Sequence, residues 1–495
     1  MTETTSKRTI TICLNHARLW RWQHELVMRL ARHPDIDPVV RLVDGPPPPR
    51  AFTLLLMLEK FAFRLQAGNA CDLLNEKAFE PYLERRDAMS SGLVVDLAGQ
   101  TANSAFLPDI AVLYDGAASD DAALLAVLDA RSPALTIVDR EGQVVISGLP
   151  AVEDRTVATR ALDTIFSALL QLCVKAMTVP LTRDAQPSPI QARSKAIHSG
   201  PVLSFGATSL AEKLNARIAR LCHRAPRWFV AWRQINETES RTSLPGASAY
   251  RRLADDGGRY YADPFLFVAD GQTHLFVEEY DHASGKGLIS TSLLGADGFE
   301  RPRPVLETQF HLSYPHVFTH SGAIWMIPES LQSRTVDLYR AERFPDRWVH
   351  EAVLLENVEA SDATVCQHDG LWWMFAATRT WRGSNWDTLS VFWAPDLAGP
   401  WQPHAGNPIL VDHRCARPAG DFFHYDGSLW RPAQDCSEGY GTGLAFCRID
   451  TLDLEVVRQS VHSTVRLRDG AVQRGPHSLN RTRTIEAIDL YGTSA

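Results

Sequence analysis

The stretch ADPFLFVADGQTHLFVE at residues 262–278 has three further copies in the second half of the chain. They are YPHVFTHSGAIWMIPE at 314–329, SDATVCQHDGLWWMFAA at 361–377 and PAGDFFHYDGSLWRPAQ at 418–434. Each copy has an apolar run, a turn centred on a glycine and a second apolar or aromatic run, the pattern of a β-hairpin. The glycines are Gly271, Gly322, Gly370 and Gly427, and three positions after them stand His274, Trp325, Trp373 and Trp430.

The spacing of these copies predicts a β-propeller. The four glycines are 51, 48 and 57 residues apart, close to one four-stranded blade per copy. A fifth blade is expected from GPHSLN at 475–480 and IEAIDLY at 485–491. The strand that closes the ring is expected from WFVAWR at 228–233, because a propeller with unpaired first and last blades would leave open sheet edges.

Length and composition predict a soluble protein of two domains. The chain has 495 residues, 45% of them hydrophobic and 22% charged, with a net charge of −8. The negative charge argues against a nucleic-acid partner. The eight cysteines form no CxxC pair, so we expect reduced thiols and no metal site built from them. No secretion signal and no transmembrane segment are evident, AFTLLLML at 51–58 being the closest approach, so a cytoplasmic location is expected.

The first 180 residues alternate between predicted strands and predicted helices. TITICLN at 9–15, LWRWQHELVMRLARH at 19–33 and DPVVRLVDG at 37–45 read as strand, helix and strand. Further strands at 92–99, 109–116 and 134–140, and helices at 122–131 and 156–177, predict a doubly wound, Rossmann-like α/β domain over 1–180. A linker and connecting helix are expected over 181–224, and a five-bladed β-propeller over 225–495.

The ligand of the α/β domain is not evident from its motifs. The first strand runs into Asn15 and His16 without a GxGxxG turn, so ordinary dinucleotide binding is not expected, and the cofactor stays unknown. The strand order loosely resembles the N-terminal domain of formyltransferases. Asp96 and Asp115 end strands, where α/β ligand sites lie, but acidic residues are also common in such loops.

Two repeat positions point towards the propeller axis. Eight residues before each glycine stand Asp263, Tyr314, Asp362 and Ala419, so two blades direct a carboxylate to one place. Seven residues after each glycine stand Glu278, Glu329, Ala377 and Gln434, three of which are polar and form a second polar position of the repeat. Asp435 directly follows Gln434. Asp also starts strands and caps turns in any protein, but two at one register, each in an apolar strand, favour a functional role.

These residues resemble a known family. ADPFLF with Asp263 is similar to the blade-one motif of glycoside hydrolase family 43, where this Asp is the general base. SDATV with Asp362 is similar to the blade-three Asp that orients the acid in that family. GPHSLN with His477 is similar to the blade-five His near the axial metal or water site of the family. The resemblance implies a carbohydrate-active enzyme with its site in the propeller funnel.

A closer resemblance covers about residues 225–490. The runs HLSYPHVF, IPES, ASDATV, NPIL and RPAQDCS are similar to the N-terminal propeller domain of plant glucosamine inositolphosphorylceramide transferases and their bacterial relatives. This resemblance implies a carbohydrate or glycoconjugate ligand.

One departure separates the chain from the hydrolases. The family requires a blade-four Glu as acid, and here Arg417 stands in its place within CARPAGDFFHYDG. Arg417 suggests either an anionic ligand or a surface ion pair. Glu329 is left as a possible acid.

Three hypotheses follow from these patterns. The first is a glycosidase or glycosyl-transferring enzyme with Asp263, Asp362 and Glu329 as catalytic residues. Sugar-binding roles are then expected for Tyr314, His316, Trp325, Glu278, Arg417, Gln434, Asp435 and His477. The second is a propeller that binds a glycan or headgroup without turnover. In the third, the α/β domain carries the reaction and the propeller selects the substrate. The oligomeric state is not predicted.

Overall fold

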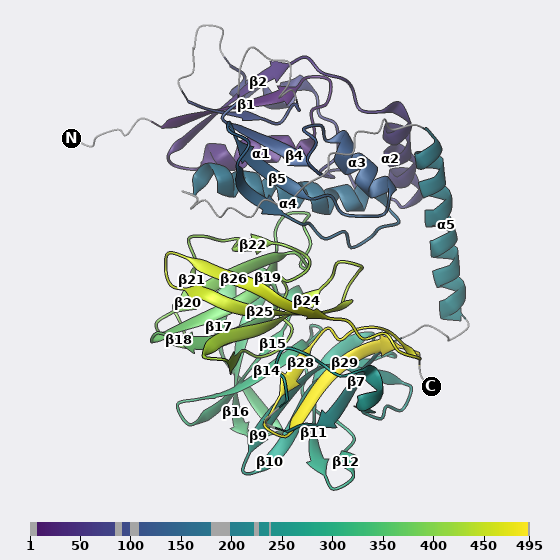
Figure 1. The fold of residues 1–495 in the computed structure, drawn as a ribbon, viewed down its shortest axis with the longest axis vertical. Coiled ribbons are helices and arrows are strands. Elements are labelled where there is room, and N and C mark those ends of the chain that lie inside the picture. The colour runs from purple at the N-terminus through teal and green to yellow at the C-terminus, as the bar shows by residue number, and fades with distance from the viewer. Residues whose placement is uncertain are drawn as a thin grey trace, which may run out of the picture. The chain divides into compact units, whose positions relative to one another are not determined.

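The structure is a computed structural model that describes residues 7–84, 92–99, 108–179, 199–221, 227–236 and 239–493. Its internal contacts divide the chain into two units. The first comprises Met1–Ile218 together with Thr380–Ser384, and the second comprises Ala219–Arg379 with Asn385–Ala495. In Figure 1 the first unit is drawn mainly in purple to blue and the second in teal to yellow.

The first unit contains one six-stranded sheet in the order β2-β1-β3-β4-β5-β6. Its strands are β1 (Arg8–Asn15), β2 (Ile36–Val43), β3 (Leu93–Asp96), β4 (Ile110–Tyr114), β5 (Leu135–Asp139) and β6 (Val144–Gly148). The first four run parallel to one another, and β5 runs antiparallel to both of its neighbours, β4 and β6. The prediction of parallel α/β pairing is therefore confirmed for four strands only. A short connection joins β5 to β6 and allows only a hairpin, so the sheet is mixed.

The helices of this unit are α1 (Arg21–Arg32), α2 (Arg50–Ala62), α3 (Asp121–Leu128), α4 (Ala158–Thr178) and α5 (Ser199–Leu221), with a 3-10 segment at Glu76–Tyr82. Helix α4 contacts α1, α2 and α3. It is long and apolar enough to cross a membrane, but 78% of its most apolar stretch is buried, as expected of a core helix. The resemblance to formyltransferases stays a prediction.

Two helices depart from the sequence expectations. Helix α2 was not predicted at all, and α5 begins in the segment that its composition marked as linker. Helix α5 forms there because Val202 and Phe205 repeat at helical spacing and are both buried, while Pro201 lies in its first turn, where it is tolerated. The predicted linker residues 180–198 and the end of the predicted helix at 222–224 lie outside the described residues.

The second unit consists of five sheets, the blades of the predicted propeller. Blade one contains β9 (Arg259–Ala269), β10 (Gln272–Asp281), β11 (Lys286–Gly295), β12 (Gly298–Phe299) and β13 (Arg303–Leu306). Blade two contains β14 (Ser313–His320), β15 (Ala323–Glu329), β16 (Thr335–Arg343) and β17 (Arg347–Glu356). Blade three contains β18 (Glu359–His368), β19 (Leu371–Arg379), β20 (Thr388–Ala394), β21 (Gln402–Pro403) and β22 (Leu410–Val411). Blade four contains β23 (Phe423–Tyr425), β24 (Ser428–Asp435), β25 (Gly443–Leu452) and β26 (Val457–Val465).

The fifth blade closes the ring. It joins β27 (Val472–Arg474), β28 (Leu479–Arg481) and β29 (Ile485–Gly492) to β7 (Arg227–Gln234) and β8 (Arg251–Arg252). Strand β7 pairs with β29 from Gly492↔Arg227 to Ile485↔Gln234. The predicted closing strand is therefore confirmed, and the two ends of the propeller sequence hold each other in one sheet (Figure 1).

The four repeated turns have the geometry that the sequence requires. Each glycine has a positive φ, and so does the residue before it: Asp270, Ser321, Asp369 and Asp426. Two consecutive positive φ values are the signature of a type I′ hairpin turn, for which Asp-Gly is favoured. Trp373 and Trp430 are buried in the hydrophobic clusters of the propeller, so they are scaffold residues.

Candidate functional site

The repeat position eight residues before each glycine has an unusual backbone conformation. Asp263, Tyr314 and Asp362 have φ values of 48°, 46° and 55°. Each of the three lies at a β-bulge, where the pairing with the second strand of its hairpin shifts register. In blade one the shift falls between Phe276 and Glu278 of the second strand, and blades two and three have a shift at the matching place. A β-bulge with a left-handed residue is strained for a side chain of this size, and bulges redirect side chains near active sites.

Each bulge frees a backbone N–H, and a carboxylate of the preceding blade accepts it. Asp489 Oδ2 accepts from Asp263 N at 3.0 Å, and Asp263 Oδ2 accepts from Tyr314 N at 3.2 Å. Glu329 Oε2 accepts from Asp362 N at 3.0 Å. Asp263 and Glu329 therefore join successive blades, a scaffold role that the sequence did not suggest, because buried N–H groups must find acceptors.

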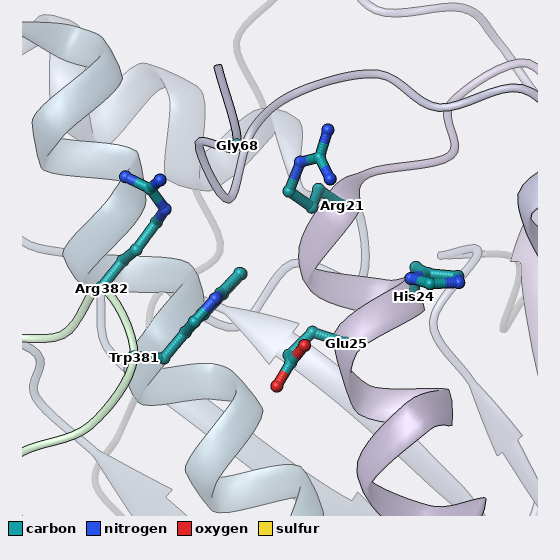
Figure 2. Close-up of a pocket in the computed structure, with 6 residues that line it drawn as sticks. All are labelled: Arg21, His24, Glu25, Gly68, Trp381 and Arg382. Carbon is teal, nitrogen blue, oxygen red and sulfur yellow. The ribbon is translucent and has the colours of Figure 1, made fainter. Parts of the chain in front are cut away.

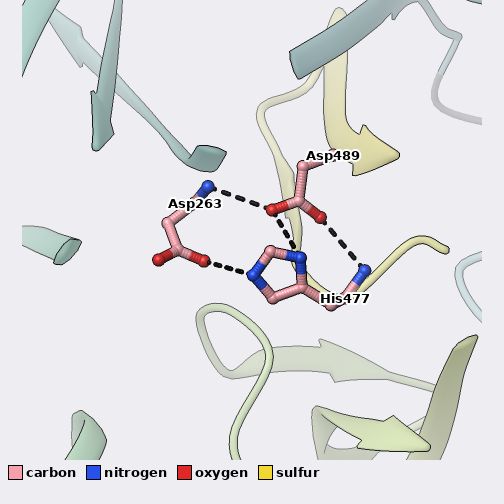
Figure 3. A group of neighbouring side chains, drawn as sticks. All are labelled: Asp263, His477 and Asp489. Atoms are coloured by element: carbon pink, nitrogen blue, oxygen red, sulfur yellow. Dashed lines mark hydrogen bonds and ion pairs between the residues drawn. The ribbon is translucent and has the colours of Figure 1, made fainter. Parts of the chain in front are cut away.

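The blade-five histidine lies between two carboxylates (Figure 3). His477 Nε2 is 3.0 Å from Asp263 Oδ1, and Nδ1 is 2.9 Å from Asp489 Oδ2. Burial lowers the pKa of His477, but Asp489 and Asp263 outweigh it and raise that pKa to about 10. Burial raises the pKa of Asp263, with His477 opposing it. The imidazole is therefore protonated at neutral pH.

Asp263, His477 and Asp489 have ligand atoms within 4.8 Å of one another, a set that by composition can hold a metal ion. With no ion present, the two carboxylates favour His477 as an imidazolium, whose protonated nitrogens have no lone pair for a metal. Ion pairing and metal binding are therefore alternative states of these three side chains.

A second buried group joins blades two, three and four. Arg417 Nε donates to Asp362 Oδ2 at 2.6 Å, and its Nη2 donates to Asp362 Oδ1 at 3.2 Å and to Glu329 Oε2 at 3.3 Å. Gln434 Nε2 also donates to Asp362 Oδ2, at 2.8 Å. Burial and Glu329 raise the pKa of Asp362, while Arg417 opposes them. Arg417 is thus an internal ion-pair partner, and its interpretation as a surface ion pair was wrong.

Glu278 is the carboxyl group with the fewest described partners near the axis. Its Oε1 lies 3.2 Å from Nε2 of His311, whose Nδ1 accepts the backbone N–H of Gly287 at 3.0 Å. Burial raises the pKa of Glu278, His311 opposes the shift and Asp263 adds to it. A carboxyl group with a raised pKa beside an ionisable histidine is suited to proton transfer.

Three partly exposed aromatic rings gather beside these buried charges. The Cζ atom of Arg417 lies 5.1 Å from the ring centroid of Tyr440. The ring centroid of Tyr440 is 5.2 Å from that of His477. The ring centroid of Trp386 is 5.5 Å from that of Tyr440. The ring centroid of Trp228 is 6.0 Å from that of Tyr440 and 4.1 Å from that of His477. We refer to Trp228, Trp386 and Tyr440 as the aromatic trio. Aromatic faces of this kind stack on the C–H surfaces of sugars.

The remaining predicted site residues lie elsewhere or serve the scaffold. Tyr314 is fully buried. Its hydroxyl oxygen accepts the backbone N–H of Gly420 at 2.6 Å and lies 2.9 Å from Thr364 Oγ1. His316 is 1% exposed, and its Nε2 lies 3.4 Å from Oδ1 of the exposed Asp421. Trp325 donates to His320 O beside its own hairpin turn, and Asp435 pairs with Arg466 at 2.6 Å.

The sequence reasoning missed Asp489, His311 and the aromatic trio. Asp489 had a detectable signal, because it is an acid in the middle of the apolar run IEAIDLY, where an unpaired charge would be costly. His311, Trp386 and Tyr440 lie in segments outside the repeated hairpins, so no repeat position marked them.

The first unit has its own pocket of about 410 Å³ (Figure 2). It is lined by Arg21, His24, Glu25, Gly68, Trp381 and Arg382. It contains neither Asp96 nor Asp115. Asp96 Oδ1 accepts the backbone N–H groups of Ala98 and Gly99, and Asp115 accepts Ala134 N at 2.8 Å, so both hold turns.

The comparisons with known proteins concern the second unit. Residues 249–490 match the family model described as "Glucosamine inositolphosphorylceramide transferase 1, N-terminal", which confirms the resemblance predicted from the sequence. The chain is 36% identical over 205 residues to the transferase 1 of that name from Oryza sativa subsp. japonica and 35% identical over 205 residues to that of Arabidopsis thaliana. Each match covers 40% of this chain and 27% of the relative, so the chain spans about a quarter of the length of these proteins.

Among solved structures, a thermostable family-43 glycoside hydrolase is similar with a TM-score of 0.32 and 14% identity. The match covers 41% of this chain and 75% of that one. A GH43_1 enzyme from Xanthomonas citri complexed with xylose is similar with a TM-score of 0.36 and 13% identity, over 48% of this chain and 88% of that one.

Proposed function

We propose, from the match of residues 249–490 to the N-terminal region of glucosamine inositolphosphorylceramide transferases, that the second unit is a carbohydrate-active module. It engages a glycosyl group of a glycoconjugate at the axial end of the propeller. The observation that carries the proposal is the aromatic trio beside the buried carboxyl groups of Asp263, Glu278 and Asp362. Stacking rings next to acid groups is what sugar recognition and glycosyl chemistry both need.

The charge of the cluster favours an amino sugar. Five carboxyl groups lie there, against three side chains that can carry a positive charge. The acids are Asp263, Glu278, Glu329, Asp362 and Asp489, and the bases are His311, Arg417 and His477. Even with one of the five protonated, carboxylates outnumber the basic side chains, and the excess negative charge attracts a protonated amine. The name of the plant relatives includes glucosamine, and this sugar is the ligand that we propose first.

For turnover, Glu278 is better placed than Glu329 to donate a proton. Glu329 already accepts Asp362 N and pairs with Arg417, whereas Glu278 has a raised pKa and His311 beside it. Asp263 stays the proposed base. Asp362 has a positioning role, because it holds the guanidinium of Arg417 in place. This pairing of base and acid comes from blade one alone.

A second candidate is binding without turnover. The observation that favours it is that both oxygens of Asp362 and both described contacts of Asp263 serve partners within the protein. Under this alternative the cluster is a rigid floor for the aromatic trio, and any reaction belongs to another domain.

Glycan-array screening of the full chain, followed by calorimetry with glucosamine, glucose and N-acetylglucosamine, tests the proposal. We expect glucosamine to bind most tightly, because its ammonium group is charged and the other two are neutral. Release of free sugar from bound glycoconjugates, followed by chromatography, separates turnover from binding alone. Absence of any glycan binding would overturn both candidates, and equal affinity for the three sugars would overturn the amino-sugar assignment.

A further inference from the structure

Helix α2 presents apolar side chains on two opposite faces. Phe52 and Leu56 are buried, and this face of the helix packs on α4. The other face is exposed at positions spaced i, i+3, i+4 and i+7. It consists of Leu54 (54% exposed), Met57 (58%), Leu58 (57%) and Phe61 (88%). A helix that is apolar all round needs an apolar environment on both sides, and the protein supplies only one.

Helix α5 repeats this arrangement. Val202, Phe205 and Ser209 form its buried face. A second apolar stripe, about a third of a turn away, is exposed along most of the helix. It consists of Leu203 (73% exposed), Leu210 (71%), Leu214 (57%) and Ile218 (50%). Solitary exposed apolar side chains are normal, but eight on two helices form a patch.

The two helices are neighbours in the first unit. The ammonium group of Lys213 on α5 lies 3.5 Å from the ring centroid of Phe63, directly after α2. Lys213 also lowers the pKa of Glu59 on α2, against the larger effect of burial. Figure 1 shows α2 and α5 side by side. We call the eight exposed apolar side chains on α2 and α5 the helix-pair face.

The charges around the helix-pair face are positive, although the chain as a whole carries −8. Arg50, Lys60 and Arg64 flank the stripe of α2, and Lys213 and Arg217 flank that of α5. Among the described residues of the two helices, the acids are Glu59 and Glu212. Glu59 is buried and accepts the backbone N–H groups of Ala158 and Thr159, and Lys60 pairs with Asp72. One exposed acid therefore stands against the four remaining bases.

We propose that the helix-pair face rests on the surface of a membrane that contains anionic lipids, with its leucines, Met57 and Phe61 in the acyl boundary and its basic residues at the headgroups. Apolar stripes with basic flanks are the pattern of interfacial helices. A second copy of the chain is a poorer occupant, because two such faces would bring the basic residues of one copy against those of the other. This membrane contact would involve the first unit alone and is independent of the function proposed for the second.

Flotation of the full chain with lipid vesicles tests the proposal. We expect binding to phosphatidylcholine vesicles with about a third phosphatidylglycerol, and weak binding to phosphatidylcholine alone. Binding should fall in about 0.5 M NaCl, which screens the headgroup attraction. Absence of wild-type flotation with the anionic vesicles would overturn the proposal.

Matched variants identify the face. Leu58→Glu with Phe61→Glu should reduce partitioning to anionic vesicles at least about a hundredfold, because two exposed apolar groups are replaced by charges. Val268→Glu with Val353→Glu is the control, since these residues are 52% and 40% exposed in the propeller. Arg50→Glu with Arg217→Glu should remove the preference for anionic lipid while leaving the apolar stripes in place.

Circular dichroism must show that each variant is folded, and the high exposure of Leu58 and Phe61 favours this. Equal loss of binding in the propeller control would overturn the proposal. So would a wild-type dimer, seen by light scattering, that the Leu58→Glu, Phe61→Glu variant converts to a monomer without a change in vesicle binding.

Discussion

Glu329 of blade two accepts the backbone N–H of Asp362 in blade three, at 3.0 Å. The bulge at Asp362 exposes that N–H, and no neighbouring strand can pair with it. The side chain predicted as a catalytic acid is thus a connection between blades. Several axial carboxyl groups share this double character, structural and chemical.

Glu329→Ala should lower the free energy of unfolding by about 2–4 kcal/mol, because it leaves Asp362 N without its acceptor and weakens the buried Arg417 network. Glu329→Gln keeps an acceptor oxygen and should cost less. Urea unfolding measures both. Glu351→Ala is the matched control, since Glu351 and its partner Arg340 are each 40% exposed. A loss no larger than in this control would show that the connection is unimportant.

The stability of the propeller should fall as the pH rises. His477 has a pKa of about 10 in the folded protein, against about 6.5 when unfolded. Its contribution is fully present below the unfolded pKa and is lost as the pH rises through the folded pKa. Urea unfolding between these limits should show wild type and His477→Gln approaching each other with increasing pH. Parallel curves would contradict the assignment of an imidazolium.

Tyr314→Phe should cost about 1–3 kcal/mol of stability, because the buried N–H of Gly420 loses the hydroxyl that accepts it at 2.6 Å. The control is Tyr425→Phe, since Tyr425 is 38% exposed. Glycan affinity should not change in either variant. A selective loss of affinity in Tyr314→Phe would restore the original expectation that this residue contacts sugar.

Glu278→Gln distinguishes an enzyme from a binding module. If Glu278 donates the proton, turnover should fall at least about a hundredfold, while glycan affinity changes little. Asp435→Asn, a buried acid paired with Arg466, provides the comparison for general disturbance. Equal losses in the two variants would argue against a proton-transfer role, and chromatography of the released sugar gives the rates.

Tyr440→Ala should weaken glycan binding about tenfold or more, because it removes the central ring of the aromatic trio. Tyr440→Phe keeps the ring and should retain binding. Calorimetry with the best glycan from the array measures both variants. An unchanged affinity in Tyr440→Ala would place the sugar elsewhere.

Much of the fold was predictable because its information is local. The turn at Asp270 and Gly271 and the apolar alternation on either side specify one hairpin, and four copies specify the repeat. The antiparallel end of the first sheet was not predicted, since the apolar run of β5 is also what a parallel strand shows, and β6 lies outside the strands expected from the sequence. Helix α2 was missed because its stretch is apolar on both faces and shows no amphipathic period.

By itself, the sequence determined the five-bladed propeller, its closing strand and the register at which side chains turn to the axis. Only the tertiary structure decided which role each axial residue has. Asp263 and Asp489 are 226 residues apart in the chain, yet they bond to each other and enclose His477. Turn and strand preferences act between neighbours, whereas the charge and partners of a buried group depend on what the folded chain brings within a few ångströms of it.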